Sequence, residues 1–394
     1  MSRVEAIDTF VCTMPKRRDW LQHGMDFTLE TRVILRLRTK DGIEGWGEAT
    51  ALSIWGGMGG KYYGETPETV VHIVHDLLGP KVLGADPLKT RALMDHLDTI
   101  IVGHPYAKSM IENALQDIRG KICGQPVYNL LGGTYRDGVR IGHMLGLMAT
   151  EEAVDEATQA IESDGITAFQ IKGGSNPERD FEVVRKLRKA LPADIFLRLD
   201  GNKGYGKMPK ELGNIMRRLE AEGINAVEQP ANSVDGLRAC REAVSVPILA
   251  DEGCWTALDV LDLWRAQAID AVSVYVAKAG GIERASEVAR TCALVGFRAD
   301  VNGSLETGIG TAASMHMALA AETLTLPSII PIPSLARKHL TEFAGRYWED
   351  DLVTEGFSYE KGQLKISDKP GLGIAVDGKL VEKYAGDTQR STRA

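Results

Sequence analysis

The beginning of the chain alternates apolar and polar residues and then changes to helical spacing. Residues 4–13 and 31–50 are rich in alternating or β-branched apolar residues, and a turn-prone Lys40-Asp41-Gly42 interrupts the second run. This order is typical of an antiparallel meander. Residues 66–84, which start with Thr-Pro, and 107–124 then show apolar positions at helical spacing. The pattern predicts an α+β module over residues 1–126.

From about residue 139 the pattern becomes a repeat of a short apolar run followed by a helix-forming stretch. A clear example is Asn176-Pro177, an N-cap residue followed by proline at the first helical position. This repeat favours a (β/α) barrel over residues 127–335. A doubly wound sheet is the second choice, because no glycine-rich phosphate loop follows the first run. The apolar runs are 139–146, 168–172, 195–200, 226–230, 247–252, 271–278, 297–303 and 328–333.

The remaining residues, 336–394, read as short strands and loops. We expect this segment to return to the first module and to complete it. The predicted fold is therefore α/β, a modified barrel with an α+β capping domain formed by the N-terminal part and the C-terminal tail.

Five ionisable residues end successive apolar runs at the period of the repeat: Lys172, Asp200, Glu228, Asp251 and Lys278. The C-terminal ends of barrel strands form the mouth where chemistry takes place, so these side chains are predicted to converge. Charges at the end of a buried strand are costly unless they are paired or bind a metal ion. A shared function explains the pattern better than five separate surface charges do.

Three of these residues, Asp200, Glu228 and Asp251, fall on consecutive predicted strands. Three neighbouring carboxylates repel one another, and a hard divalent cation relieves that repulsion. Ligation by oxygen alone favours Mg2+, with Mn2+ as the substitute. The alternative interpretation, separate helix caps or salt bridges, suits one such carboxylate but not three in phase.

The two lysines, Lys172 and Lys278, are predicted to lie four strands apart and therefore on opposite walls of the mouth. A substrate between them would be approached from both faces. Lysine acts as a base when its pKa is lowered by burial, by a cation or by a like charge. This arrangement suits removal of a proton α to a carboxylate, while a metal ion stabilises the growing oxygen charge.

Composition narrows the class of protein. The chain has 394 residues, of which 44% are hydrophobic and 25% charged, and a formal net charge of -8. The negative charge argues against nucleic-acid binding. No apolar run is long enough for a membrane span and no signal-like start is present, so we expect a cytoplasmic protein. Five scattered cysteines support neither a disulfide framework nor a zinc site.

These motifs together resemble the enolase superfamily, and within it the mandelate racemase and muconate lactonizing enzyme group. The likeness covers nearly the whole chain, through GIEGWGEAT, IK, LDGN, VEQP, ADE, AKAGG, GIGTAASMH and DKPGLGI. It implies a capped barrel, Mg2+ held by Asp200, Glu228 and Asp251, and Lys172 and Lys278 as acid and base. The muconate lactonizing enzyme-like subgroup is indicated because ADVNGSLE has no histidine after strand seven.

One departure from the family pattern concerns the second strand. The family usually has Lys-x-Lys there, and this chain has Gln170 before Lys172. By the strand period both side chains point into the mouth. Gln170 can orient Lys172 or a substrate by hydrogen bonding, but it cannot lower the pKa of Lys172 by charge repulsion.

Other substrate contacts are predicted from the loops. Residues 15–26 and 52–64 are candidate specificity loops, and the second is glycine-rich like a mobile lid. Packing against the protein body is the alternative role for the aromatic residues. The candidate substrate-binding residues are Gln170, Asn202, Trp20, Trp55, Tyr62 and Glu306.

The predicted function is an enolase-superfamily isomerase that removes the α-proton of a small carboxylate and completes a racemisation, epimerisation or cycloisomerisation. The enzymatic alternative is a dehydratase acting on a hydroxy acid, acid sugar or hydroxyproline-type substrate. A barrel retained as a binding or scaffold protein is disfavoured because all three carboxylates are present. A homo-oligomer is expected.

Overall fold

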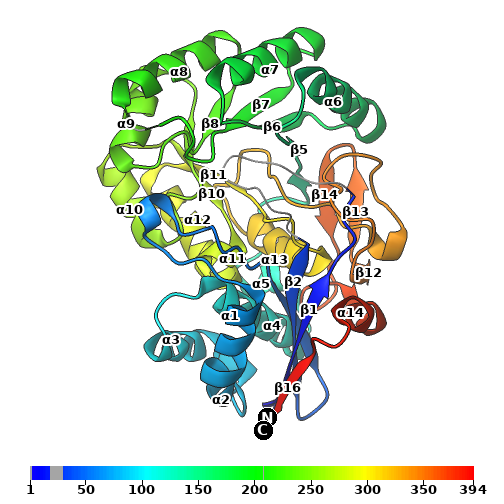
Figure 1. The fold of residues 1–394 in the computed structure, drawn as a ribbon. Coiled ribbons are helices and arrows are strands. Elements are labelled where there is room, and N and C mark those ends of the chain that lie inside the picture. The colour runs from blue at the N-terminus through cyan, green and yellow to red at the C-terminus, as the bar shows by residue number, and fades with distance from the viewer. Residues whose placement is uncertain (1, 18–29, 207) are drawn as a thin grey trace.

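The computed structural model describes residues 2–17, 30–206 and 208–394, with a capping module below a barrel (Figure 1). The predicted meander is confirmed as three antiparallel strands. The C-terminal strand pairs with the first of them, so the tail completes this sheet in the order β16-β1-β2-β3, and the two chain ends lie together (Figure 1). The strands are β1 (Val4–Thr13), β2 (Thr31–Thr39), β3 (Glu44–Ala49) and β16 (Arg390–Arg393).

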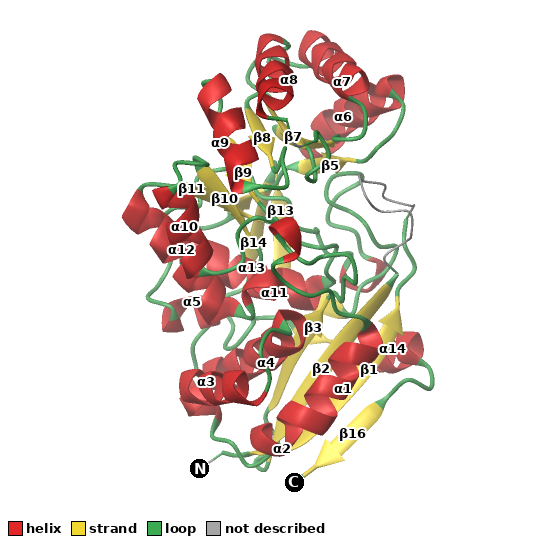
Figure 2. Cartoon of the chain, turned by 60° about the vertical axis from the view of Figure 1, so that its left-hand side comes forward, coloured by secondary structure: helices red, strands yellow, loops and turns green. Residues whose placement is uncertain are grey.

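Helices pack on one face of this sheet, as Figure 2 shows. The closest approach is between β3 and α4: a Cβ built on Gly47 would lie 2.0 Å from the Met110 carbonyl oxygen. The glycines of the Gly45-Trp46-Gly47 segment are thus required by packing. The cap helices are α1 (Pro67–His72), η2 (Ile73–Leu78), α2 (Gly79–Val82), α3 (Thr90–Ile100) and α4 (Pro105–Cys123).

The barrel is a curled sheet whose seven strands are parallel and follow one another in sequence order. The predicted eighth run forms no regular strand. Instead it closes the barrel through isolated bridges, Ile141 with Ser328 and Asn302 with Ile329. The strands are β5 (His143–Leu145), β6 (Ala168–Lys172), β7 (Phe196–Asp200), β8 (Ala226–Glu228), β9 (Ile248–Ala250), β10 (Ala271–Val274) and β11 (Arg298–Val301).

Helices cover the outside of the barrel (Figure 1). The predicted N-cap is confirmed: the Asn176 side chain accepts hydrogen bonds from the amides of Glu178 and Arg179 at the start of α7. The helices are α6 (Thr150–Asp164), α7 (Pro177–Ala190), α8 (Pro209–Ala221), α9 (Val234–Ala243), α10 (Ala257–Arg265), α11 (Val276–Ala279), α12 (Ile282–Val295) and α13 (Gly308–Leu319).

Short elements connect the barrel to the cap. β14 pairs with β13 and with β4, β12 pairs with β15, and α14 packs on β1. None of the helices in the described ranges is long and apolar enough to cross a bilayer. The bounds are α5 (Val127–Leu130), β4 (Val139–Arg140), β12 (Val353–Glu355), β13 (Phe357–Glu360), β14 (Gln363–Ile366), β15 (Ala375–Val376) and α14 (Gly378–Ala385).

One predicted strand is wrong in its extent. The run 271–278 was expected to be a single strand ending at Lys278, but β10 ends at Val274 and Lys278 lies on the short helix α11. Apart from Ser273 and the final Lys278 the run is apolar, so neither strand nor helix periodicity marks the change. Gly280, with φ 94°, ends the helix in the left-handed conformation that glycine adopts without strain.

Candidate active site at the mouth of the barrel

The first wall of the mouth is built by β6 and β7. Lys172 is the last residue of β6 and is paired in register with Asp200, the last residue of β7. The Lys172 Nζ donates a hydrogen bond of 2.6 Å to the Asp200 Oδ2. Asp200 is in turn paired in register with Glu228 at the end of β8. The strand register therefore places these three predicted residues side by side.

The opposite wall carries Asp251 and Lys278. Asp251 follows β9 directly, and the Lys278 Nζ donates to the Asp251 Oδ1 at 2.7 Å. The same Nζ donates to the Asp251 carbonyl oxygen at 2.6 Å and to the Ser273 carbonyl oxygen at 3.1 Å. Lys278 thus reaches back from α11 to the ends of β9 and β10.

Glu228 lies between the walls and receives donors from four side chains. Gln170 Nε2 donates at 2.7 Å, Ser273 Oγ at 2.9 Å and Asn302 Nδ2 at 2.9 Å, and the Arg198 Nε lies 3.1 Å from the Glu228 Oε2. All of these groups are buried. Glu228 is therefore held in a fixed orientation at the centre of the strand ends.

The charges at the mouth act on one another. Burial raises the pKa of Asp200 to about 6, with Glu228 and Asp251 adding to the rise and Lys172 opposing it. Burial also raises the pKa of Asp251. Although burial opposes the charged form of Lys172, Asp200 and Glu228 raise its pKa above the ordinary value. Burial and the opposite charges thus act against each other in the Lys172 and Asp200 pair.

Glu228 differs from its neighbours. Burial opposes its ionisation, but the adjacent Arg198 and Lys172 bring its pKa below the ordinary value. Arg198 also contacts Asp300 deeper in the barrel. This guanidinium supplies the cation that permits a third ionised carboxylate at the mouth.

The residues at the mouth fit a hard divalent cation. Two further buried acceptors, Asn202 Oδ1 and Glu252 Oε2, have no hydrogen-bond partner among the described residues. The Asn202 backbone amide donates to the Asp200 Oδ1 at 2.9 Å, and the Asn202 side-chain Nδ2 donates to the Glu252 Oε1 at 3.4 Å. In the part of the chain that the structure describes, no three carboxylate, histidine or cysteine side chains are already grouped as a metal site, and lysines lie against two of the carboxylates. The donor set is nevertheless all oxygen, as Mg2+ requires.

The capping loop 52–64 lies on the barrel loops. Trp55 is buried and contacts the Tyr275 ring edge-on at 5.2 Å between centroids. Tyr62 stacks on Trp255 at 4.6 Å, and its hydroxyl donates to the Asp259 Oδ2 at 2.6 Å. The Tyr62 hydroxyl is thus bound to protein, in agreement with the packing alternative.

The remaining predicted contacts lie as follows. Both oxygens of the Glu306 carboxylate accept from the Ser304 amide at 2.8 Å, and burial raises the Glu306 pKa to about 7. Its hydrogen bonds in the structure thus go to its own loop and not to Lys278. Trp20 lies outside the described residues.

Sequence reasoning missed Arg198 and Tyr275. Arg198 stands two residues before Asp200, so the strand period alone would have pointed it into the barrel. Tyr275, whose hydroxyl donates to the Asp251 Oδ2 at 3.2 Å, lies inside an apolar run that gives no such signal.

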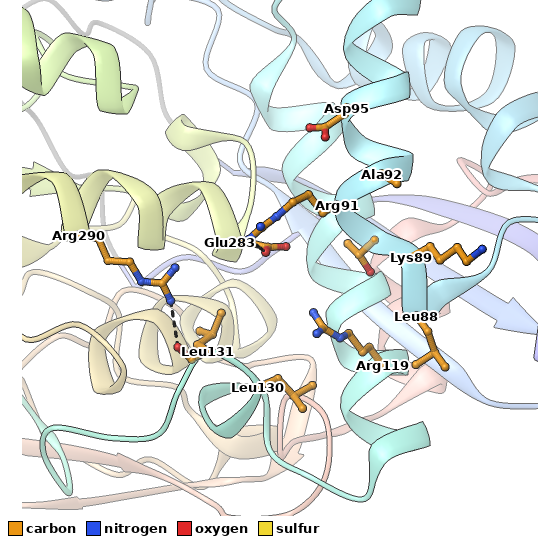
Figure 3. A pocket seen from close by; sticks show the side chains of 11 residues that line it. Leu88, Lys89, Arg91, Ala92, Asp95, Arg119, Leu130, Leu131, Glu283 and Arg290 are labelled. Atoms are coloured by element: carbon orange, nitrogen blue, oxygen red, sulfur yellow. Dashed lines mark hydrogen bonds and ion pairs between the residues drawn. The ribbon is translucent and has the colours of Figure 1, made fainter.

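A separate polar pocket of about 550 Å³ lies at the seam between α3, α4 and α12 (Figure 3). Two of its arginines already have protein partners. Arg91 pairs with Glu283, and the Arg290 Nη2 donates to the Leu131 carbonyl oxygen at 3.0 Å. None of the residues predicted to be functional lines it. The mouth, not this seam, gathers the candidate residues.

Comparison with known proteins agrees with this architecture. Residues 7–132 match the model of the mandelate racemase/muconate lactonizing enzyme N-terminal domain, and residues 152–380 match the enolase C-terminal domain-like model. N-succinyl-L-Arg/Lys racemase of Bacillus cereus is 26% identical over 97% of each chain. Its solved structure has a TM-score of 0.89 at 25% identity and covers 99% of this chain and 100% of the other.

Two more relatives show the range of the group. Muconate cycloisomerase 1 of Acinetobacter baylyi is 30% identical, over 96% of this chain and 98% of its own. A solved dipeptide epimerase from Cytophaga hutchinsonii, complexed with Mg and the dipeptide D-Ala-L-Val, shares the fold with a TM-score of 0.87 at 24% identity over 99% of each chain. The chain belongs to the mandelate racemase/muconate lactonizing enzyme group of the enolase superfamily.

Proposed function

We propose that this protein is a Mg2+-dependent isomerase that removes the α-proton of a small carboxylate and completes a racemisation, epimerisation or cycloisomerisation. The observation that carries this proposal is the row Lys172, Asp200 and Glu228 in register, with Asp251 on the next strand. An amine beside an oxygen-rich cation site is what α-proton removal needs.

Asp200, Glu228 and Asp251 would hold the Mg2+, with Asn202 and Glu252 as buried oxygen acceptors beside them. When bound, Mg2+ supplies positive charge for the substrate carboxylate as the α-carbon loses its proton. Arg198 and Gln170 keep Glu228 oriented.

Lys172 takes the α-proton at its Nζ in the neutral form, which becomes populated when Asp200 and Glu228, the carboxylates that raise its pKa, give their charge to a bound cation instead. The C–H electron pair passes into the enediolate of the substrate. Reprotonation from the opposite face inverts the carbon, and Lys278 is the group that the sequence predicts there. The capping loop, seated through Tyr62 on Asp259, excludes water from this step.

Dehydration is the second candidate. It is favoured by the unequal surroundings of the two lysines, because Lys278 has protein acceptors for three hydrogen bonds and Lys172 has one. An elimination needs only one strong base together with an acid for the departing hydroxyl.

The test is incubation of the purified protein with Mg2+ in D2O. The probes are N-succinyl-L-lysine, N-succinyl-L-arginine, L-Ala-L-Glu and cis,cis-muconate, followed by proton NMR and chiral chromatography. Deuterium at the α-carbon with inversion supports the isomerase. Loss of water from a panel of hydroxy acids without inversion supports the dehydratase, and no reaction with either panel contradicts both. Asp200→Asn is the inactive control.

A further inference from the structure

The backbone that carries Lys278 is short and is followed by two glycines. α11 has four residues, and Gly280 and Gly281 after it have φ values of 94° and 131°. Glycine adopts such values freely, so these two residues give the backbone little stiffness of its own. An acid or base must be held close to its working position, because a misplacement of about 1 Å can cost about 100-fold in rate. This segment therefore needs support from neighbouring elements.

The support comes from α4 of the capping module. The Glu112 Oε2 accepts a hydrogen bond of 2.6 Å from the backbone amide of Ile282, the first residue of α12. The Asn113 Oδ1 accepts from the same amide at 3.2 Å, and the Ser109 Oγ donates to the Val276 carbonyl oxygen at 3.3 Å. The three side chains of α4 are buried, and their spacing puts them on one face of the helix. Helix α4 thus holds the segment before and after Lys278.

Glu112 also packs against the second glycine. A Cβ built on Gly281 would clash with the Glu112 Oε2, so this close approach requires glycine in addition to the positive φ. The other carboxylate oxygen, Oε1, accepts from the Gln116 Nε2 at 2.7 Å, which fixes the rotation of the carboxylate. An acidic group at the first turn of α12 is favoured by the helix dipole. Glu112 is therefore a rigid contact between the capping module and the backbone next to Lys278.

We propose that Glu112 is a positioning residue for Lys278, which acts from the capping module through Gly281 and Ile282. This inference rests on the proposed function and deepens it, because it adds a residue of the capping module to the support of one lysine. The other lysine, Lys172, is held differently, by the pairing of β6 with β7. Loss of Glu112 should therefore impair proton transfer on the Lys278 face of the substrate more than on the Lys172 face.

The test measures α-deuteration of N-succinyl-L-lysine and of N-succinyl-D-lysine separately, in D2O with Mg2+. The two enantiomers present the α-proton to opposite walls of the mouth, and Lys278→Met identifies the enantiomer that depends on Lys278. Glu112→Ala is expected to slow this enantiomer by about 10- to 100-fold and the other by less than about threefold. Glu112→Gln, which keeps an acceptor oxygen for the Ile282 amide, should restore most of the rate.

Asp117→Asn is the matched control. Asp117 is another buried carboxylate of α4, but it accepts from the amides of Trp46 and Leu372. This variant should leave the ratio of the two rates unchanged, even where it lowers Tm. Equal slowing of both enantiomers by Glu112→Ala, or an equal change of the ratio by Asp117→Asn, overturns the inference. If Glu112→Ala does not fold, Glu112→Asp, whose side chain is one methylene shorter, takes its place under the same criteria.

Hydrogen exchange of the backbone amides of residues 276–283, followed by mass spectrometry, is a second measurement that needs no substrate. Glu112→Ala should speed exchange in this segment by about tenfold or more, and Asp117→Asn should not. Unchanged protection in Glu112→Ala overturns the inference. If the wild type deuterates neither enantiomer, the proposed function fails for these substrates, and hydrogen exchange alone decides the inference.

Discussion

The two lysines at the mouth occupy similar sequences and different surroundings. Lys172 precedes Gly173-Gly174, and Lys278 precedes Ala279-Gly280-Gly281. Lys172 ends a strand and makes one hydrogen bond, to Asp200, so two of its N–H donors meet no protein acceptor in the described ranges. Lys278 ends a helical turn and uses all three. Buried lysines with an ion-pair partner are therefore not equivalent: in the described ranges the amine on the strand has one protein acceptor, while the amine on the helical turn has three.

The largest expected effect comes from removing the metal ion that residues of both walls are proposed to hold. Treatment with EDTA should abolish turnover, because Asp200, Glu228 and Asp251 then face the substrate without a cation, and Mg2+ should restore it. Added Mg2+ at about 100 times its Kd should also stabilise the fold by about 2.7 kcal/mol, measured as a rise in Tm. Asp200→Asn should lose both responses. An EDTA-treated protein with full activity would contradict the metal site.

Removing the open lysine alone is expected to have the next largest effect. Lys172→Met should lower α-deuteration by about 1,000-fold, because it removes the amine at the end of β6 that is proposed as the base. The measurement is the loss of the α-proton NMR signal. Lys186→Met, which alters a surface lysine paired with Glu151 and Glu182, is the control and should react normally. If Lys172→Met kept more than a tenth of the wild-type rate of α-deuteration, Lys172 would not be the base.

The buried Arg198 side chain, which contacts both Glu228 and Asp300, gives a stability prediction. Arg198→Met leaves Glu228 and Asp300 buried without their shared cation. Loss of one partner from a buried ion pair costs about 3–5 kcal/mol, which chemical denaturation would measure. The double variant Arg198→Met with Asp300→Asn should recover part of this loss, since one stranded charge is gone. A single variant as stable as the wild type would show that Glu228 needs no such support.

The smallest expected effect concerns the capping loop 52–64, which lies on the barrel loops. Tyr62→Phe removes one hydrogen bond to Asp259 and keeps the stacking on Trp255. A bond of this kind contributes about 0.5–1.5 kcal/mol, so kcat/KM should fall by about two- to tenfold. Tyr63→Phe is the matched control, because Tyr63 is 71% exposed. Equal effects of the two variants on kcat/KM would mean that the Tyr62 hydroxyl does not fix the capping loop to the barrel.

Much of the fold was predictable because local pattern and global packing agree. The meander, the Thr66 and Asn176 caps and the strand-helix repeat all follow from spacing and cap chemistry. The register of Lys172, Asp200 and Glu228 was predictable too, since each ends an apolar run of one repeat unit.

The contacts of the predicted substrate residues were not predictable, because they depend on neighbours far away in the sequence. The hydrogen bond from Tyr62 to Asp259 and the ring contact between Trp55 and Tyr275 form only when the capping module packs on the barrel. The support of Glu228 likewise comes from four residues on four different segments.

The sequence by itself determined the repeat, the chemical types at each strand end and hence the gathering of three acids and an amine at one mouth. Only the tertiary structure decided where β10 stops. The end of β10 places Lys278 on a helical turn, where its amine contacts Asp251, and places the Tyr275 hydroxyl within hydrogen-bond distance of the same carboxylate. The reason is physical: an apolar run fits a buried strand and a buried helical turn equally well, and long-range packing around it selects between them.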